Sequence, residues 1–352
     1  MRTRIFVGAL RALAAPAVLF ALAGPVSAAP ADFAGTALAA ATAAGPWHTG
    51  PSFPGVADDQ PALLSCASAG WCLAVDQQLQ QTWVLQGGKW RTGPFGAAGQ
   101  GVPTALSCIS PGTCTGADAQ GDILSFAHER WSARPGPSQQ GGGPMSCATA
   151  RLCLFVNGVG QWFTWDGHQA SHPRVAYPAL ANTMGSGIYA LSCASGTSFC
   201  AAADSLGALG TFSAGRWGPL FTKVTAPPVS IGCYSAKACV AAFRPGAGSG
   251  ARSGTWATWD GRSWSVHPAG TRGLPPVPAS TGSLSCSARA CTLLYARGGH
   301  AGMYRWTSAG WSPAVQLKGA AAQLVSCSAS GACTAVRPGT SPKEPGSTWW
   351  SS

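Results

Sequence analysis

The chain has 352 residues, of which 46% are hydrophobic and only 9% charged, and its 22 Lys and Arg outnumber its 11 Asp and Glu. The hydrophobic content excludes a disordered chain, and the 47 Gly and 27 Pro favour many short strands and turns over helices. The basic residues are scattered without a run of five or more, which argues against dedicated nucleic-acid binding.

The first 28 residues have the three parts of a secretory signal peptide. Three arginines form the basic region, residues 12–24 form the apolar region, and Val26-Ser27-Ala28 is a small-residue cleavage site. A membrane anchor is the less favoured interpretation because the apolar run is too short to span a bilayer, and no later segment could cross one. We therefore predict a secreted, extracellular protein with no membrane span, in which residues 29–44 form an Ala-rich leader. Without the three arginines the chain has 19 basic and 11 acidic residues, a net charge of +8. This charge suits an anionic partner or general solubility.

From residue 63 onward one unit of about 43 residues recurs seven times, a period typical of propellers and solenoids. Each unit holds one pair of cysteines, and the pairs account for all 14 cysteines of the chain. They are Cys66/Cys72, Cys108/Cys114, Cys147/Cys153, Cys193/Cys200, Cys233/Cys239, Cys286/Cys291 and Cys327/Cys333. In a secreted chain this spacing predicts seven local disulfides, each worth roughly 2 kcal/mol. Seven zinc half-sites are disfavoured, because six histidines cannot serve them.

Each unit divides into four predicted strands, named A to D. Strand A ends at the first cysteine and strand B opens with the second, as in Leu63–Cys66 and Cys72–Val75. Strand C ends on a large apolar residue in every unit: Leu85, Phe126, Trp165, Phe212, Trp259, Trp306 and Trp350. Five residues later strand D carries Trp90, Trp131, Ala170, Trp217, Trp264 and Trp311.

The seventh unit stops before its strand D, and a lone D-like strand stands at the other end of the repeats. Residues 45–50 match residues 89–93, yet they precede the first strand A without an A, B or C strand of their own. A closed ring explains this displacement, since its first and last strands pair, whereas an open solenoid needs polar caps. We predict an all-β fold over residues 45–352, a seven-bladed β-propeller with four antiparallel strands per blade and closure by the N-terminal strand.

Two of the predicted C–D turns add a family resemblance. Thr164-Trp165-Asp166-Gly167 and Thr258-Trp259-Asp260-Gly261 resemble the Asp-box turn of bacterial-neuraminidase-type repeat propellers. The whole pattern is similar to the secreted cysteine-paired repeat propellers of actinobacteria. The resemblance implies a propeller fold and a structural role for both aspartates, away from any catalytic face, and it is nearly silent on activity.

The B–C and D–A loops of a propeller gather on one face, where ligands usually bind. The fourth residue after the second cysteine ends strand B at that mouth, and around the ring it is Asp76, Asp118, Asn157, Asp204, Phe243, Tyr295 and Arg337. Arg244, Arg252, Arg297, His300 and Lys343 add positive charge in units five to seven. These residues predict a mouth with an acidic and a basic sector. The competing interpretation is that Asp and Asn simply favour turns.

The B–C connections are longer in units five to seven, so we expect their loops (243–254, 295–302 and 337–347) to carry the binding contacts. Tryptophans that recur at fixed strand positions are interpreted as packing between blades. The aromatic residues outside that pattern are the better candidates for binding: Trp71, Trp162, Trp256, Phe243 and Tyr295. We expect Trp71 to be exposed in an A–B turn.

These features favour a monomeric, non-enzymatic binding propeller for a glycan or an extracellular protein, without a cofactor. The alternative is a sialidase-like glycoside hydrolase with an acidic site at the mouth, for example at Asp76 and Asp118. Its expected Tyr/Glu pair is not evident, since the only glutamates are Glu129 and Glu344. Calcium held by oxygens of the mouth is a further option under either function.

Overall fold

The computed structural model describes residues 47–54, 61–76, 81–93, 101–138, 141–157, 159–176, 187–244, 254–268, 271, 275, 283–297, 300–312, 315–317, 322–337, 339 and 346–351. The predicted signal peptide (1–28) and leader (29–44) lie outside these residues. The described residues form 29 strands and no helix, so none of them supplies a helix that could span a membrane.

The strands assemble into seven antiparallel sheets, the blades, each following the chain from strand A to strand D. Blade one is β2 (Pro61–Ser68), β3 (Trp71–Asp76), β4 (Thr82–Gln86) and β5 (Lys89–Thr92). Blade two is β6 (Pro103–Ser110), β7 (Thr113–Asp118), β8 (Ile123–Ala127) and β9 (Arg130–Arg134). Blade three is β10 (Met145–Thr149), β11 (Leu152–Val156), β12 (Gln161–Trp165) and β13 (Arg174–Val175). Blade four is β14 (Ile188–Cys193), β15 (Cys200–Asp204), β16 (Leu209–Ser213) and β17 (Arg216–Trp217).

The remaining three blades complete the ring. Blade five is β18 (Pro228–Ser235), β19 (Ala238–Phe243), β20 (Thr255–Trp259) and β21 (Trp264–His267). Blade six is β22 (Ser283–Cys286), β23 (Cys291–Arg297), β24 (His300–Thr307) and β25 (Gly310–Trp311), with β26 (Val315–Leu317) also paired to β24. Blade seven is β27 (Leu324–Cys327), β28 (Cys333–Arg337), β29 (Ser347–Ser351) and β1 (His48–Thr49).

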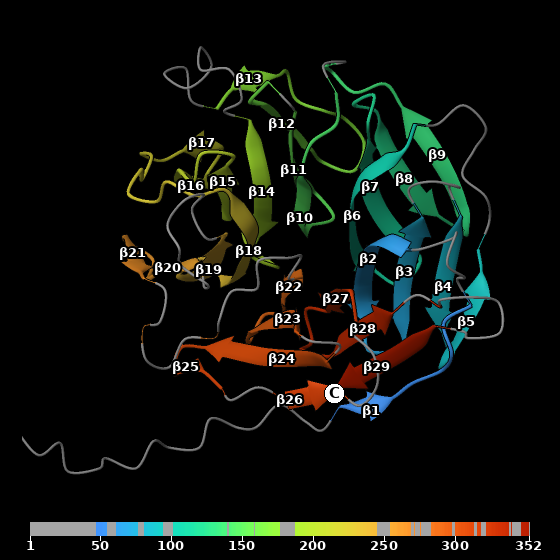
Figure 1. Cartoon of the computed structure of the whole chain (residues 1–352). Helices are drawn as coiled ribbons and strands as arrows, with labels where there is room; N and C mark the ends of the chain where they lie inside the picture. The colour runs from blue at the N-terminus through green and yellow to red at the C-terminus, as the bar shows by residue number, and fades with distance from the viewer. Residues whose placement is uncertain are drawn as a thin grey trace, which may run out of the picture. The chain divides into compact units, whose positions relative to one another are not determined.

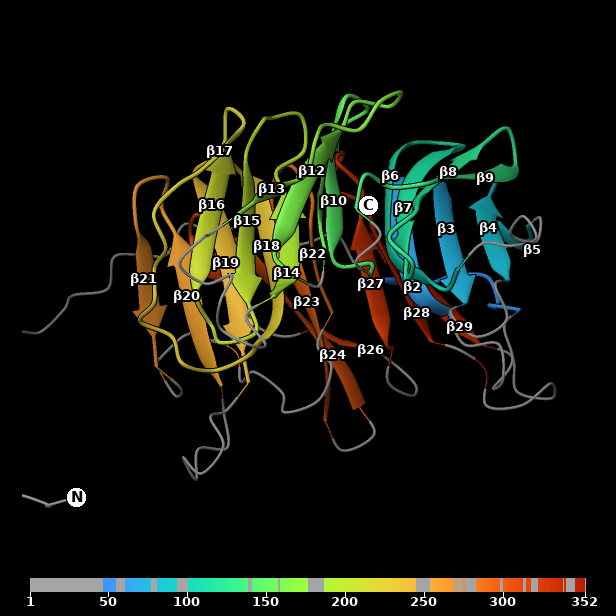
Figure 2. The ribbon, with the colours of Figure 1, turned by 90° about the horizontal axis from the view of Figure 1, so that it is seen from above.

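The seven A strands lie innermost, and each contacts the next around the ring until β27 meets β2 (Figure 1). The predicted seven-bladed β-propeller is therefore confirmed. Hydrophobic clusters fill the space between neighbouring blades, because both faces of each sheet are covered. In Figure 2 the β16–β17 and β8–β9 turns lie at the upper edge of the ring, and β24 reaches the lower edge.

The predicted closure by the N-terminal strand is also confirmed. β1 pairs antiparallel with β29, with His48 opposite Trp350 and Thr49 opposite Trp349. Fully buried Phe53 follows β1 and packs against Trp83 and Trp90 of blade one, with ring centroids 5.1 and 5.0 Å apart. The N-terminal segment therefore completes blade seven and fills the gap between blades seven and one.

The strand-C position predicted for blade seven is wrong by one residue. In blades one to six the second cysteine lies opposite the predicted residue, for example Cys72 opposite Leu85. In blade seven Cys333 lies opposite Ser351, and Trp350 lies one position earlier. Since successive side chains of a strand point to opposite faces, this shift turns Trp350 outward, where it is 39% exposed. Trp349 is the buried tryptophan of this strand.

Each blade contains one disulfide between strands A and B, and no cysteine is free. The two cysteines lie directly opposite each other, with Cα–Cα distances between 3.8 and 4.0 Å. The bonds join the pairs predicted from spacing: Cys66–Cys72, Cys108–Cys114, Cys147–Cys153, Cys193–Cys200, Cys233–Cys239, Cys286–Cys291 and Cys327–Cys333. Such a set is typical of an oxidising compartment.

The residue before the first cysteine links each blade to the next. It is a serine in six blades, and its Oγ accepts a hydrogen bond from the backbone amide of the first cysteine in the following blade. The six residues, here called the serine ring, are Ser65, Ser107, Ser146, Ser192, Ser285 and Ser326. Blade five has Gly232 at this position, and a Cβ there would lie 2.3 Å from Sγ of Cys286 in blade six. Blades five and six therefore pack too closely for a seventh serine.

Candidate functional site

The B strands end, and the C strands begin, on one face of the ring, which we call the B–C face. Asp76, Asp118 and Asp204 are the last residues of their B strands, and Asn157 follows the end of β11. All four side chains are buried. Their placement at the ends of the B strands is as predicted, but their side chains are not presented to solvent.

The side chains of Asp118, Asn157 and Asp204 hold the B–C turns that follow them. Oδ1 of Asp118 accepts hydrogen bonds from the amides of Gln120 (3.0 Å) and Asp122 (2.8 Å), and its Oδ2 accepts one from Gly101 (3.1 Å). Oδ1 of Asn157 accepts from the amides two and four residues further on. Capping of this kind is why Asp and Asn favour turns. The geometry thus supports the turn interpretation for Asp118 and Asn157.

Asp204 follows the same pattern with one difference. Its Oδ1 accepts from the amides of Leu206 (2.9 Å) and Ala208 (2.7 Å), while its buried Oδ2 has no hydrogen-bond partner among the described residues. Burial raises the pKa of the Asp204 carboxyl above its usual range, against the lowering effect of the hydrogen bonds from Ala208 and Leu206.

In blades five to seven the predicted mouth residues differ in exposure. Phe243 is fully buried in β19, and Arg244 directly after it is exposed. Tyr295 is half-buried, and its ring stacks on Tyr304 with centroids 5.2 Å apart. Arg337 is half-buried at the end of β28. These side chains are spread over three blades, and the described contacts bring no two of them together.

Two of the three long loops expected to carry the binding contacts, 243–254 and 337–347, fall largely outside the described residues. Positions 245–253, 338 and 340–345 of these loops are not described, and they include Arg252, Lys343 and Glu344. In blade six the expected loop is instead a hairpin, because Tyr295 pairs with Gly302 and Arg297 with His300 as β23 and β24 continue. The prediction of an open loop at 295–302 is therefore wrong, and extended strand pairing accounts for its length.

Four of the five aromatic residues singled out for binding lie in the core. Trp71, Trp162, Trp256 and Phe243 are all buried, and the predicted exposure of Trp71 is wrong. Trp71 begins β3 and packs toward Phe126 of blade two, with ring centroids 6.4 Å apart. Aromatic residues outside the repeat pattern thus join the packing between blades, as the tryptophans within it do.

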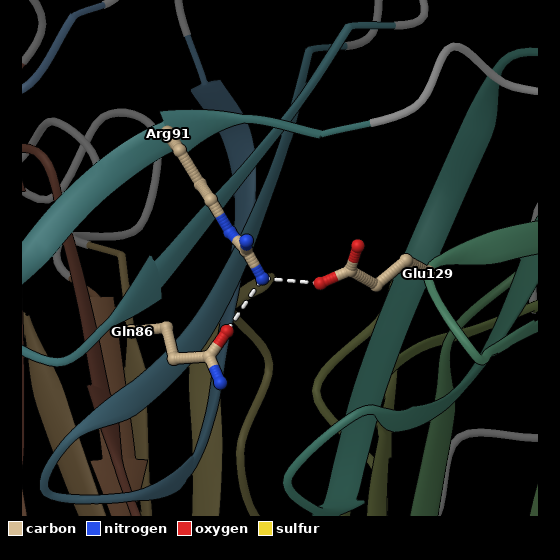
Figure 3. A network of polar contacts seen from close by, with 3 residues as sticks. All are labelled: Gln86, Arg91 and Glu129. Carbon is tan, nitrogen blue, oxygen red and sulfur yellow. Dashed lines mark hydrogen bonds and ion pairs between the residues drawn. The ribbon is translucent and has the colours of Figure 1, made fainter.

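The acidic residues of the C–D turns, on the opposite face, also have structural contacts. Asp166 and Asp260 are exposed in C–D turns, and Oδ1 of each accepts two backbone amides at 2.7–2.8 Å, which lowers the pKa of both carboxyls. Glu129 lies in the C–D turn of blade two and forms an ion pair with Arg91 of blade one, which also contacts Gln86 (Figure 3). Because this pair is exposed, it contributes little to stability. Within the described parts of the chain, no three His, Cys, Asp or Glu residues are grouped as metal ligands.

Large apolar side chains are exposed on the B–C face of blades two to four. Among the described residues seven large hydrophobic side chains are exposed, and five of them lie at this end of three consecutive blades. They are Val102, Val159, Val175, Tyr189 and Leu206. Tyr189 is 60% exposed, and Leu206 is 54% exposed in the turn held by Asp204. Loop length and charge, from which the binding face was predicted, do not indicate these five side chains.

A cavity of about 610 Å³ lies inside the ring of A strands. All six residues of the serine ring line it, together with Ser110 at the end of β6 and residues of the A–B turns such as Ala150 and Ser195. Its described lining contains no charged side chain. The serine hydroxyls make it polar, but each Oγ already accepts a hydrogen bond from the next blade.

Two solved structures show the same architecture. One is the crystal structure of the WD40 β-propeller domain of Doa1, with a TM-score of 0.60 and 8% identity over 87% of this chain and 97% of that chain. Another is a chain of the crystal structure of the Mitotic Checkpoint Complex, with a TM-score of 0.60 and 11% identity over 94% of this chain and 99% of that chain.

The chain shares their propeller fold. At such low identity the likeness extends to the fold alone. No family model matches the sequence, and no curated protein matches it. The predicted resemblance to neuraminidase-type and actinobacterial propellers therefore gains no support from these comparisons.

Proposed function

We propose that this protein is a secreted, non-catalytic binding propeller that holds an extracellular protein on its B–C face. The observation that carries the proposal is that five of the seven large apolar side chains exposed among the described residues lie on the B–C face of blades two to four. Solvent-exposed apolar clusters on a rigid surface mark sites of protein–protein contact. The seven disulfides support an extracellular location, since such bonds persist in oxidising compartments.

The surrounding geometry supports a preformed binding surface. Buried Asp118, Asn157 and Asp204 hold the turns of this face through backbone hydrogen bonds, so that the apolar side chains project from fixed loops. A surface fixed before binding loses less conformational entropy on association. The glycan alternative has less support, because sugars stack on flat aromatic rings and four of the five exposed residues are aliphatic.

Parallel screens of the full chain test this function. A phage-displayed random 15-residue peptide library and a glycan and cell-wall-polymer array are applied to the same preparation. We expect retained peptides, and we expect Tyr189→Ser with Leu206→Ser to abolish their retention. Val315→Ser, an equally apolar exposed position in blade six, is the matched control and keeps it. Retention of glycans alone would support the glycan alternative, and sugar turnover lost on Asp76→Asn or Asp118→Asn would support the hydrolase alternative.

A further inference from the structure

Resting on this proposed function, we propose that the contact surface is a patch formed by Val159 and Val175 of blade three and Tyr189 and Leu206 of blade four. We further propose that it recognises a protein segment in which apolar side chains stand next to carboxylates. These four residues are called the blade 3–4 patch.

Backbone contacts join the segments that carry Tyr189 and Leu206 in blade four. Ile188 pairs with Asp204, and the amide of Ser205 donates to the carbonyl of Gly187 at 3.1 Å. Tyr189 sits in the β-bulge between Ile188 and Ala190, where the register shifts and one residue is left unpaired. A bulge re-aims a side chain, which explains how a tyrosine on an innermost strand becomes the most exposed large hydrophobic residue among those described.

The segments that carry Val159 and Val175 are joined by backbone contacts in blade three. Val175 pairs with Gln161, and the amide of Ala176 donates to the carbonyl of Gly160 at 3.1 Å. One hydrophobic cluster spans the junction of the two blades, and it includes Val156 and Trp162 from blade three and Ile188, the neighbour of Tyr189, from blade four. The patch thus lies over a packed junction between blades.

The exposed charges around the patch are positive. Arg174 precedes Val175, and its guanidinium lies 5.8 Å from the ring of Trp162. Lys223 lies 5.8 Å from the ring of Phe221, which pairs with Leu209 just after the Leu206 turn. Residues 141–226 contain only two carboxylates, Asp166 in the turn on the opposite face and Asp204 buried under Leu206. A partner's carboxylates would therefore meet cations and no exposed acid.

Charge also argues for a different protein as the occupant. A second copy would bring the same Arg174 and Lys223 to the contact, on a chain whose net charge without the predicted signal peptide is +8. Like charges placed opposite each other at an interface oppose association. An apolar segment with carboxylates satisfies both the aliphatic side chains of the patch and its flanking cations.

The test measures binding of defined peptides to the full chain. Peptides selected from the random library are sequenced, and the tightest is remade with its Asp and Glu replaced by Asn and Gln. We expect the selected set to be enriched in acidic residues beside Leu, Phe or Trp. Arg174→Ser with Lys223→Ser should weaken binding about three- to tenfold, the size expected for two exposed ion pairs. Arg151→Ser with Lys237→Ser removes the same charge from exposed A–B turns and is the matched control.

Each outcome separates this inference from the proposed function. Peptides that bind equally well after neutralisation, or that survive Leu206→Ser, would overturn the blade 3–4 patch while leaving a protein-binding propeller in place. Failure to retain any peptide would overturn both. A dimer in sedimentation velocity that Leu206→Ser abolishes would assign the patch to a second copy instead. Binding of an arrayed glycan that Tyr189→Ser removes would assign it to sugar.

Discussion

The backbone amide of Cys66 in blade one donates a 2.9 Å hydrogen bond to Oγ of Ser326 in blade seven, 260 residues away in the sequence. The same contact joins five further pairs of neighbouring blades, so one residue type at one position of the repeat ties most of the ring together. The Ser-Cys dipeptide of the repeat thus combines a bond within a blade with a bond between blades.

Removal of one hydroxyl from the serine ring should destabilise the protein measurably. Ser65→Ala leaves the amide of Cys108 without its 2.8 Å acceptor, and we expect the free energy of unfolding to fall by about 1 kcal/mol. Urea denaturation followed by tryptophan fluorescence measures this change. Ser110→Ala, at an exposed position at the end of the same type of strand, is the control. Equal losses in both variants would contradict the linking role.

The junction between blades five and six should not tolerate a side chain at Gly232. Gly232→Ala places a methyl group 2.3 Å from Sγ of Cys286, so the blades must move apart, and we expect a loss of roughly 1–3 kcal/mol. Gly70→Ala is the control, because a Cβ there meets no atom within 4 Å. A variant at 232 as stable as the control would show that this junction adjusts freely.

Closure by the N-terminal segment makes the ring sensitive to short deletions. Loss of residues 45–50 removes β1 and exposes the edge of β29, so we expect aggregation in light scattering. Phe53→Ala should by itself cost about 3–5 kcal/mol, because its ring is fully buried between blades seven and one. Deletion of residues 29–44 is the comparison and should leave melting unchanged. Unchanged melting and monodispersity after loss of residues 45–50 would refute closure by this strand.

The disulfides should be local and individually replaceable. Peptide mapping without reduction should find each first cysteine joined to the second cysteine of its own blade. Replacement of Cys193 and Cys200 by alanine should lower the free energy of unfolding by about 2 kcal/mol, the loop-closure term for a loop of this length. Two or more bonds between different blades would contradict the alignment of the repeats.

The buried carboxyl of Asp204 predicts a pH dependence of a definite sign. Since its pKa is raised in the folded state, its contribution to stability is complete below the unfolded pKa and is lost as pH rises through the folded pKa. Asp204→Asn keeps an oxygen that accepts from the amides of Leu206 and Ala208. Because the amide side chain does not ionise, the variant does not lose stability as pH rises. We therefore expect the stability of the variant, relative to the wild type, to increase from pH 4 to pH 7.

Asp166→Asn is the control, because the pH dependence of its stability relative to the wild type should have the opposite sign. The pKa of Asp166 is lowered by amide hydrogen bonds, so its contribution is present above the unfolded pKa and is lost as pH falls. Urea denaturation at several pH values measures both variants. The same slope for both would contradict the burial of Asp204.

The repeat pattern was sufficient to predict the ring, its closure and all seven cysteine pairs, because strand phase and cysteine spacing are local properties of the sequence. It failed at Trp349 and Trp350, since two adjacent tryptophans fit strand C equally well and only pairing to β28 decides between them. It also missed Tyr189, whose exposure depends on a bulge in the pairing of β14 with β15. The burial of Asp118 and Asp204 depends on contacts with the backbone of the turns, which residue type does not reveal.

The pairing of β1 with β29 also places the first and last described residues of the chain in the same blade. Trp47 and Ser351, the first and last residues described, both belong to blade seven, and blades three and four lie across the ring from it (Figure 1). A surface or fusion partner joined next to Trp47 or Ser351 would therefore lie beside blade seven. The blade 3–4 patch, on the far side of the ring, would be distant from that attachment (Figure 1).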